Sequence, residues 1–343
     1  MTDNSSKIKP LISILMPVRN SEQFLTMTIN SILDQTENNW ELIVVNDHSE
    51  DSSQQILEDF SNKDRRITVL QNEEGDGIIT ALKTAFIHSR GDLITRMDSD
   101  DLMTEYKLEK MKKLYLASGK GHVITGPVKC FSDTEIGDGY KKYEKWLNHL
   151  ILNEDCYNEI YRECVIQSSC WLVHRDDLIR CKAFNTNIYP EDYDLAFRFY
   201  KYGLKVRSYN ELLHYWRDHP ARISRNDPRY KDQQFFDLKL KYFFELDHNR
   251  EKTLVVWGTG SKGKKLVKIL HDKFDIPFRW VSNNLKKIGE TIYGTCIEDY
   301  RTIKNIDKLQ IIVTVSGPDD LKNIAVFFDE NNFLQNKHYF YFC

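Results

Sequence analysis

The sequence lacks several features that would each have placed it in a different class of protein. None of its apolar runs approaches the roughly 20 residues that a membrane-spanning helix needs, and the longest, such as 11–16 and 253–257, have the length of strands. The first ten residues, MTDNSSKIKP, contain no apolar core of the kind found in a signal peptide. No low-complexity tract or internal repeat stands out. We therefore expect an ordinary globular protein without a spanning helix.

Cysteine usage and charge exclude further classes. The seven cysteines are odd in number and include no CxxC pair, so we expect neither a disulfide framework nor a zinc site, but reduced thiols in a cytosolic protein. The formal net charge of -3 gives no reason to expect nucleic-acid binding. The length of 343 residues suggests about two domains, and an apolar fraction of 41% is enough for real cores.

The first half of the chain alternates between strand and helix patterns. Buried strands are expected at 12–16, 41–45, 67–70 and 92–97, and amphipathic helices at 21–35, 52–61 and 78–89. This alternation predicts an α/β fold with a mostly parallel sheet and helices on both faces. Polar residues follow the strand ends at Arg19, Asp47 and 98–101, where functional groups of such sheets gather.

The pattern loosens after residue 126 and then resumes near the carboxyl terminus. Helices are expected at 140–153, 191–202 and 229–247, and an extended segment at 166–173. The charged stretch 249–252 suggests a boundary, so we predict a first domain of residues 1–248 and a second of residues 249–343. Strands at 253–257, 278–281 and 311–315, with a helix through Leu270, predict a smaller α/β domain.

The segment RMDSDD, residues 96–101, places three carboxylates within four residues. Crowded like charges make one another harder to ionise unless a positive group lies among them. Hard divalent cations prefer carboxylate oxygens, and Mg²⁺ is usually held by one or two carboxylates plus substrate phosphates. We therefore interpret Asp98 and Asp100 as metal ligands. The alternative is that Asp100 or Asp101 caps a helix beginning near Thr104.

Seven segments in series carry a resemblance to a known family. They are ISILMPVRN, SILDQT, ELIVVNDHSEDSS, GDGIITALKTAF, GDLITRMDSDDL, YPEDYDLAFRFYKYG and YWRDHPARIS, which lie between residue 11 and about residue 225. In this order they resemble the family-2 glycosyltransferases of the GT-A fold. The resemblance implies transfer of a sugar from a nucleotide diphosphate donor, with inversion at the anomeric carbon.

The resemblance also implies which residues bind the nucleoside. They belong to strand-end loops and to a glycine turn, and are Pro17, Val18, Arg19, Asp47, Gly77 and Ile78. Asp47 would accept a hydrogen bond from a ring N–H of the base, which favours a UDP-sugar and leaves thymine and guanine open. Lys83 stands where the family often has asparagine, so that contact is left open.

The acidic segment and a later histidine would hold the metal if the resemblance extends to them. Asp100 would bind Mn²⁺ or Mg²⁺ directly, while Asp98 and Ser99 would lie near the ribose, with Asp98 also at the metal. Arg96 would orient the carboxylates. His219, in the segment WRDHPARIS, would complete the metal shell or meet the diphosphate.

An inverting transfer needs a base that takes the proton of the attacking hydroxyl. The pair Glu191-Asp192 opens an expected helix and falls where the resemblance places the acidic pair of the family. The helix dipole accounts for one acid at such a position but not for the pair. We favour Asp192 as the base and keep Glu191 as the alternative.

The second domain carries the spacing Gly258-x-Gly260-x-x-Gly263 between a strand and a helix, which is a dinucleotide-binding fingerprint. A dinucleotide site also needs an acid at the end of the second strand, but that strand ends in Ser282-Asn283-Asn284. The missing acid argues against NAD. The domain resembles the Rossmann-like modules attached to bacterial surface-polysaccharide enzymes, which implies an accessory role.

The favoured function is a metal-dependent, inverting glycosyltransferase that acts on a glycan or lipid-linked acceptor in bacterial surface polysaccharide synthesis. We expect it in the cytoplasm, with peripheral contact to the inner face of the membrane as an option for the aromatic residues of 235–244; packing is the alternative for them. Two other classes remain open. One is an NAD(P)-dependent oxidoreductase acting through the second domain, and the other is a non-catalytic nucleotide-sugar-binding protein.

Overall fold

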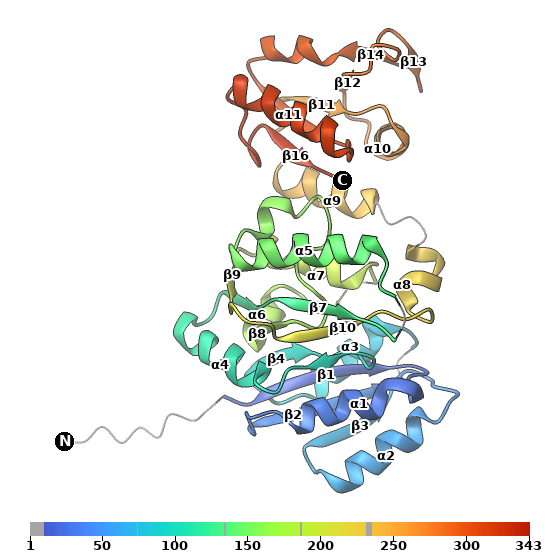
Figure 1. Ribbon diagram of the computed structural model, residues 1–343, viewed down its shortest axis with the longest axis vertical. Helices are drawn as coiled ribbons and strands as arrows, with labels where there is room; N and C mark the ends of the chain where they lie inside the picture. Colours follow the sequence, from blue (N-terminus) through green and yellow to red (C-terminus); the bar gives the residue numbers. More distant parts are fainter. Residues whose placement is uncertain (1–9, 74, 134, 186, 231–234) are drawn as a thin grey trace, which may run out of the picture. The chain divides into compact units, whose positions relative to one another are not determined.

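The computed structural model describes residues 10–343 apart from 74, 134, 186 and 231–234. The chain forms two compact units (Figure 1). The first extends to Cys156 and resumes over Val165–Asp227, and the second comprises Tyr157–Cys164 and Pro228–Cys343. The second unit therefore begins at residue 228 rather than at the predicted 249, and it also takes a segment from the middle of the chain.

The aromatic side chains before residue 249 explain this difference. The α9 helix (Phe236–Leu246) packs Phe243 against Phe340, with ring centroids 5.1 Å apart. Tyr161 stacks on Phe342 at 5.2 Å. Charge along the chain marked a polar surface turn at 249–252, whereas burial of apolar rings decides which unit a segment joins.

The first unit is built on a mixed sheet. Its strands are β1 (Ile12–Val18), β2 (Trp40–Asn46), β3 (Ile67–Gln71), β4 (Leu93–Arg96), β6 (His122–Thr125), β8 (Trp171–His174) and β9 (Lys205–Ser208). They lie in the order β3-β2-β1-β4-β8-β6-β9. β1 to β4 are parallel to one another, and β8 is antiparallel to β4 and β6. The predicted mostly parallel α/β sheet is confirmed.

A smaller sheet and a set of helices complete this unit. The smaller sheet has the order β5-β10-β7, with β5 at Leu102–Met103, β10 at His214–Arg217 and β7 at Val128–Phe131. The helices are α1 (Glu22–Leu33), α2 (Ser53–Lys63), α3 (Ile78–His88), α4 (Lys107–Ser118), α5 (Asp138–Leu152), α6 (Arg175–Arg180), α7 (Glu191–Lys201) and α8 (Ile223–Asn226). The expected helix at 21–35 buries Leu25, Ile29 and Ile32 completely, as its spacing predicts.

β1 continues to Val18 instead of stopping at Pro17. The carbonyl of Leu15 accepts from Met97 on the β4 side, and the carbonyl of Val18 accepts from Asp47 on the β2 side. Successive residues thus alternate between the two neighbours, and the nitrogen of Pro17 faces the side on which β4 has already ended. A residue without an N–H is tolerated there because no ladder hydrogen bond is lost.

Two further expectations are corrected. Within the expected extended segment 166–173, the strand begins only at Trp171. The first turn of α4 is preceded by Tyr106 with no side-chain cap, so the interpretation of Asp100 or Asp101 as a helix cap is wrong. The turn at 98–101 must have another purpose.

The second unit is a separate parallel sheet with helices. Its elements after α9 are β11 (Thr253–Trp257), α10 (Ser261–Lys273), β12 (Phe278–Ser282), β13 (Thr291–Ile292), β14 (Thr295–Asp299), β15 (Leu309–Val313), α11 (Pro318–Glu330) and β16 (Tyr339–Tyr341). The strand order is β13-β14-β12-β11-β15-β16. Apart from the β13 hairpin, this is the order of the first five strands of the doubly wound 3-2-1-4-5-6 sheet.

The aromatic residues proposed for membrane contact lie mostly in the core of the second unit. Phe236, Tyr242 and Phe243 are buried, which favours the packing alternative for 235–244. Among the helices in the described part of the chain, none has the length and apolarity to cross a bilayer.

Candidate functional site

The first part of the site surrounds Asp47 at the end of β2. Only 3% of Asp47 is exposed, and its N–H donates to the carbonyl of Val18 (2.7 Å). Its carboxylate lies 3.5 Å from Nη1 of Arg19. The same carboxylate accepts from the N–H of Gly77 (3.0 Å) and from the amide of Asn72 (2.6 Å). Residues that the sequence assigned to the nucleoside thus meet at one carboxylate.

The turn before α3 closes this part of the site. Gly77 has a φ of +94°, a conformation that favours glycine, and a Cβ there would lie 3.1 Å from the hydroxyl of Tyr189. Ile78 is the first residue of α3 and is half-buried, while Pro17 is buried within β1. All of these groups lie at the carboxyl ends of parallel strands, where ligands of α/β sheets bind.

The second part of the site is the acidic turn after β4, defined as residues 98–101. Nε of Arg96 donates to Asp98 (2.6 Å), and the hydroxyl of Ser168 donates to the other oxygen of Asp98 (2.8 Å). The N–H of Asp98 donates to the hydroxyl oxygen of Ser169 (2.9 Å). Burial alone would raise the pKa of Asp98, but the charge of Arg96 and these hydrogen bonds lower it. Asp98 is therefore ionised at neutral pH.

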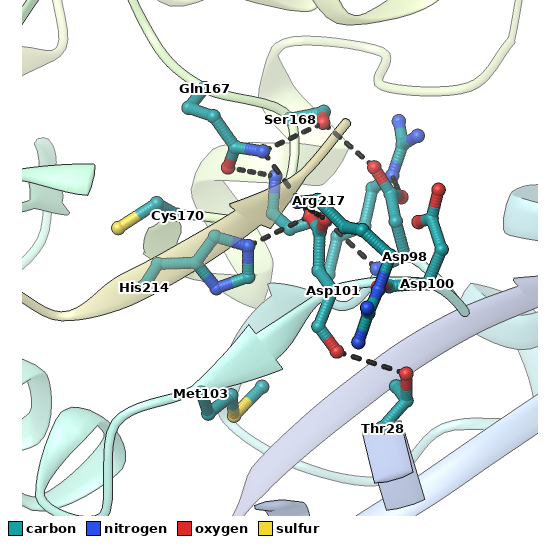
Figure 2. Close-up of polar contacts among 12 residues, drawn as sticks. Thr28, Asp98, Asp100, Asp101, Met103, Gln167, Ser168, Cys170, His214 and Arg217 are labelled. Carbon is teal, nitrogen blue, oxygen red and sulfur yellow. Dashed lines mark hydrogen bonds and ion pairs between the residues drawn. The ribbon is translucent and has the colours of Figure 1, made fainter. Parts of the chain in front are cut away.

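Asp100 pairs with the histidine that the sequence assigned to the metal. Nε2 of His219 lies 2.9 Å from a carboxylate oxygen of Asp100, and both side chains are partly exposed. Nε of Arg217 donates to the carbonyl of Asp100 (2.7 Å). The ring centroids of Phe24, in α1, and His219 are 4.6 Å apart. Figure 2 shows Asp98 and Asp100 on one side of the turn and Asp101 directed toward His214.

The donor set at this turn is suited to a hard cation, because it combines carboxylate oxygens with an imidazole nitrogen. Among the residues that the structure describes, however, no three His, Cys, Asp or Glu side chains form a metal-binding group. Asp100 and His219 are placed to share an ion, whereas the carboxylate of Asp98 is turned to Arg96 and Ser168. Such a short protein ligand set fits an ion that is also held by substrate phosphates.

Arg96 connects the acidic turn to the start of α7. Its guanidinium donates to Asp98 and also, through Nη1, to Glu191 (3.0 Å). Burial alone would lower the pKa of Arg96, but the negative charges of Asp98, Glu191 and Asp192 raise it. The sequence analysis expected a positive group among the crowded carboxylates, and Arg96 is that group.

Asp192 lies beside this pair and has a different acidity. Its carboxylate accepts from the N–H of Tyr193 (2.8 Å). Burial and the charge of Glu191 raise the pKa of Asp192 to about 7, against the opposing charge of Arg96. A carboxylate with this pKa can accept a proton at physiological pH and release it again. Glu191 is instead engaged by Arg96.

Contacts from α1 join the two parts of the site. The hydroxyl oxygens of Ser21 and Ser99 are 2.6 Å apart, and the hydroxyl of Ser21 lies 3.1 Å from the carbonyl oxygen of Arg19. The hydroxyl of Thr28 lies 2.9 Å from the carbonyl oxygens of Ser99 and Asp101. The nucleoside part and the acidic turn therefore belong to one hydrogen-bonded region of the first unit.

Behind the acidic turn lies a buried set of charged and polar side chains. Asp101, Lys107 and His214 are each 0% exposed. Nε2 of His214 lies 2.8 Å from Asp101, and Nδ1 of His214 lies 3.1 Å from Nζ of Lys107. Burial lowers the pKa of His214 well below its usual value and also lowers that of Lys107. Burial and the neighbouring charges of Asp100 and Asp98 raise the pKa of Asp101 well above its usual value.

The glycine fingerprint of the second unit has a packing explanation. Gly258 has a φ of +132°, and a Cβ on Gly263 would lie 2.0 Å from the carbonyl oxygen of Gly258. Both glycines are thus required for close approach of α10 to β11. At the end of β12, the hydroxyl of Ser282 lies 3.0 Å from that of Thr259. Close packing therefore explains Gly258 and Gly263, two of the three glycines, without a bound ligand.

Several site residues were missed by reasoning from the sequence. They are Asn72, Lys107, Gln167, Ser168, Ser169 and His214, while Asp101 was given only a capping role. Ser168 lies seventy positions from Asp98, and no local pattern links residues at that separation. The only available signal was the run Gln167-Ser168-Ser169, because three polar residues interrupt an otherwise apolar segment.

The chain is similar to known glycosyltransferases. Residues 13–181 match the family model described as glycosyl transferase family 2. An uncharacterized glycosyltransferase of Haemophilus influenzae is 31% identical over 225 residues, which cover 63% of this chain and 68% of that protein.

Two further proteins are similar over smaller shares or at lower identity. The UDP-Glc:alpha-D-GlcNAc-diphosphoundecaprenol beta-1,3-glucosyltransferase WfgD of Escherichia coli is 40% identical over 31% of this chain, but the match spans only 41% of that relative. The crystal structure of S. aureus TarS 1-349 with UDP-GlcNAc superimposes with a TM-score of 0.53 at 17% identity, over 70% of this chain and 68% of that one. The latter likeness concerns the fold alone.

Proposed function

Since this chain belongs to glycosyl transferase family 2, we propose that it moves a sugar from a nucleotide diphosphate sugar to a hydroxyl of a glycan or lipid-linked acceptor, with inversion. One observation carries this proposal. Arg96 bonds both Asp98 and Glu191, so the end of β4 and the start of α7 meet at one guanidinium. Asp192, which is suited to proton transfer, therefore lies near Asp98, which belongs to the proposed donor site.

A uridine nucleotide is the favoured donor. Asp47 already accepts hydrogen bonds from Gly77 and Asn72, and an N–H of uracil would add one more donor to this ionisable group. The relatives named above act on UDP-Glc or bind UDP-GlcNAc, which supports uridine for this chain as well. Pro17, Val18 and Ile78 would border the nucleoside as apolar neighbours.

Asp100 and His219 would hold a divalent ion, Mn²⁺ or Mg²⁺, together with oxygens of the diphosphate. The support is their separation of 2.9 Å and their partial exposure. Asp98 and Ser99 remain in the proposed set, beside the ribose and the ion. When bound, the ion neutralises negative charge on the departing diphosphate.

Asp192 would act as the general base. The acceptor oxygen forms a bond to the anomeric carbon as the bond from that carbon to the diphosphate oxygen breaks on the opposite face. The hydroxyl proton passes to Asp192, whose pKa of about 7 suits this transfer. Arg96 holds Glu191 next to the base, and the nucleoside diphosphate leaves.

The proposed setting is the assembly of a bacterial surface polysaccharide on the cytoplasmic side of the membrane. The relative that uses a diphosphoundecaprenol-linked acceptor supports a lipid-linked substrate. Peripheral contact with the membrane would be consistent with such a substrate. We propose that the second unit acts as an accessory module.

Thermal unfolding in the presence of different nucleotides tests which donor the chain binds. UDP, dTDP, GDP, CMP and NAD(H) would each be measured with and without Mn²⁺. A ligand at 100 times its dissociation constant should stabilise the fold by roughly 2.7 kcal/mol. We expect a shift with UDP that needs Mn²⁺ and is lost in Asp100→Ala. Asp319→Ala, an acid with a 97% exposed side chain in the second unit, is the matched control. A shift with NAD(H) alone would contradict the proposal.

A further inference from the structure

The hydrogen bonds behind the acidic turn form a closed ring. Lys107 donates from Nζ to the carbonyl of Ser169 (2.5 Å) and to Nδ1 of His214 (3.1 Å). His214 reaches Asp101 through Nε2 (2.8 Å). Asp98 closes the ring, because its N–H donates to Ser169 Oγ (2.9 Å) and its carbonyl accepts from Asp101 (3.3 Å). The ring therefore joins α4, β10 and the segment before β8 to both ends of the turn.

With Lys107 as an ammonium group, the directions of the hydrogen bonds at His214 follow. An ammonium group can only donate, so Nδ1 of His214 must accept from Lys107. A neutral imidazole with an accepting Nδ1 carries its proton on Nε2, and therefore donates to Asp101. The second oxygen of Asp101 accepts from the N–H of Arg217 (2.9 Å). Both oxygens of Asp101 are thus occupied, one by the imidazole of His214 and one by the backbone N–H of Arg217.

Only part of this arrangement is needed to fill the core. Lys107 and His214 are completely buried, and placing a cation and an imidazole there costs free energy that an apolar side chain of similar size would avoid. The groups that benefit are the backbone and the side chains of the acidic turn. Thr28 bonds this turn from the opposite side, at the carbonyls of Ser99 and Asp101.

We propose that Lys107 and His214 are positioning residues that hold the acidic turn in the form in which Asp98 and Asp100 face the donor diphosphate. The inference rests on the proposed function of Asp98 and Asp100 and adds two residues that contact neither donor nor metal. Their effect reaches the diphosphate part of the donor through the turn. The carboxylate of Asp47 in the nucleoside part accepts from Asn72 and Gly77, neither of which belongs to the ring.

His214 offers a pair of variants that separates positioning from packing. His214→Gln retains an amide that can accept from Lys107 and donate to Asp101, whereas His214→Leu retains only the bulk. The affinities of uridine, and of UDP with Mn²⁺, would be measured by calorimetry in both variants, together with kcat and KM for a UDP-sugar. In His214→Leu we expect UDP affinity and kcat to fall by roughly 10- to 100-fold, with uridine affinity unchanged. His214→Gln should recover most of the loss.

A second variant keeps the test valid if His214→Leu does not fold. Lys107→Met combined with Asp101→Asn replaces the ionisable groups on both sides of His214, so neither is left buried without its counterpart. We expect this double variant to fold, to bind uridine like the wild type, and to bind UDP with Mn²⁺ more weakly.

The outcomes distinguish the inference from the function on which it rests. Wild-type UDP affinity and kcat in a folded His214→Leu protein would overturn the positioning role while leaving the transferase intact. Equal losses for uridine and UDP would reduce the ring to a general structural element and would also overturn it. If the wild-type protein binds no nucleoside diphosphate, the proposed function fails first and the inference fails with it.

Discussion

Single residues determine how charge is balanced at this site, and Arg96 is the centre of that balance. Three carboxylates, those of Asp98, Glu191 and Asp192, lie close enough to raise the pKa of its guanidinium. Two of them bond it directly, whereas the pKa of Asp192 is raised to about 7. The charge of Arg96 thus lowers the pKa of Asp98, while Asp192 stays able to exchange a proton near neutral pH.

The acidity of Asp192 predicts a pH dependence for catalysis. Because a base must be deprotonated, kcat/KM should rise as the pH increases through about 7 and then level off. Asp192→Asn should lower kcat by roughly 10²- to 10⁴-fold and leave UDP affinity nearly unchanged. Steady-state rates from about pH 5.5 to about pH 8.5, which cover roughly 1.5 units on either side of pH 7, check this. Full activity in the asparagine variant would exclude Asp192 as the base.

The raised pKa of Asp192 also predicts that the folding stability depends on pH. The pKa of Asp192 in the folded protein lies above its unfolded value, so the protonated form stabilises the fold relative to the ionised form. That stabilisation is present at acidic pH and is lost as the pH rises through about 7. Urea unfolding at pH 5 and pH 8 should show less loss of stability on raising the pH for Asp192→Asn than for the wild type. An equal loss in both proteins would argue against the raised pKa.

Removal of Arg96 should be costly. Arg96 has 5% of its surface exposed, and Arg96→Met would leave the carboxylates of Asp98 and Glu191 without their cation. Breaking one partner of a buried pair typically destabilises by about 3–5 kcal/mol. Urea unfolding would measure the loss, with Arg301→Met, whose side chain is 61% exposed, as the matched control. A loss no larger than that of the control would contradict this role.

Among the secondary-structure elements, the ends of strands and the first turns of helices decide where the chemistry lies. The carboxyl ends of β1, β2 and β4 carry Arg19, Asp47 and the acidic turn. The residue before α3, Gly77, and the first residues of α7, Glu191 and Asp192, also lie in this part of the first unit. Parallel strands make this possible because all their carboxyl ends lie on one edge of the sheet.

The turn before α3 allows a test at this scale. Gly77→Ala would place a side chain at a φ of +94° and 3.1 Å from the hydroxyl of Tyr189, so we expect a destabilisation of about 1–3 kcal/mol and weaker uridine binding. Gly139→Ala, within α5 and with nothing near its Cβ, should instead stabilise by about 0.5–1 kcal/mol. Thermal unfolding and calorimetry measure both effects. Equal stability changes in the two variants would show that the turn geometry is unimportant.

For the molecule as a whole, the main departure from expectation is the composition of the second unit. The segment 157–164 belongs to it, although the chain on either side belongs to the first unit. The hydroxyl of Tyr161 donates to Asp247 (2.5 Å), and Nζ of buried Lys239 donates to the carbonyls of Arg162 and Phe342. These contacts make 157–164 dependent on residues close to the carboxyl terminus.

Truncation at the boundary suggested by the sequence tests this dependence. A fragment of residues 1–248 keeps Tyr161 and Lys239 but loses Phe340 and Phe342, which pack against Tyr161. We expect faster proteolysis at 157–164 and a lower unfolding temperature than in the full chain, because these side chains lose their buried partners. A fragment that resists protease as well as the intact protein would show that the segment does not need the second unit.

The sequence alone determined the order of strands and helices and the polar residues that follow the strand ends. Hydrophobic periodicity is local, so β11 was predicted at its observed bounds, and α1, α3 and α7 to within two residues. Tertiary structure alone decided the partners: Asp98 with Ser168, Asp101 with His214, and Tyr161 with Phe342. Each of these pairs is separated by seventy or more positions. Such contacts form only when the sheet brings distant segments together, and no periodic pattern in the sequence records them.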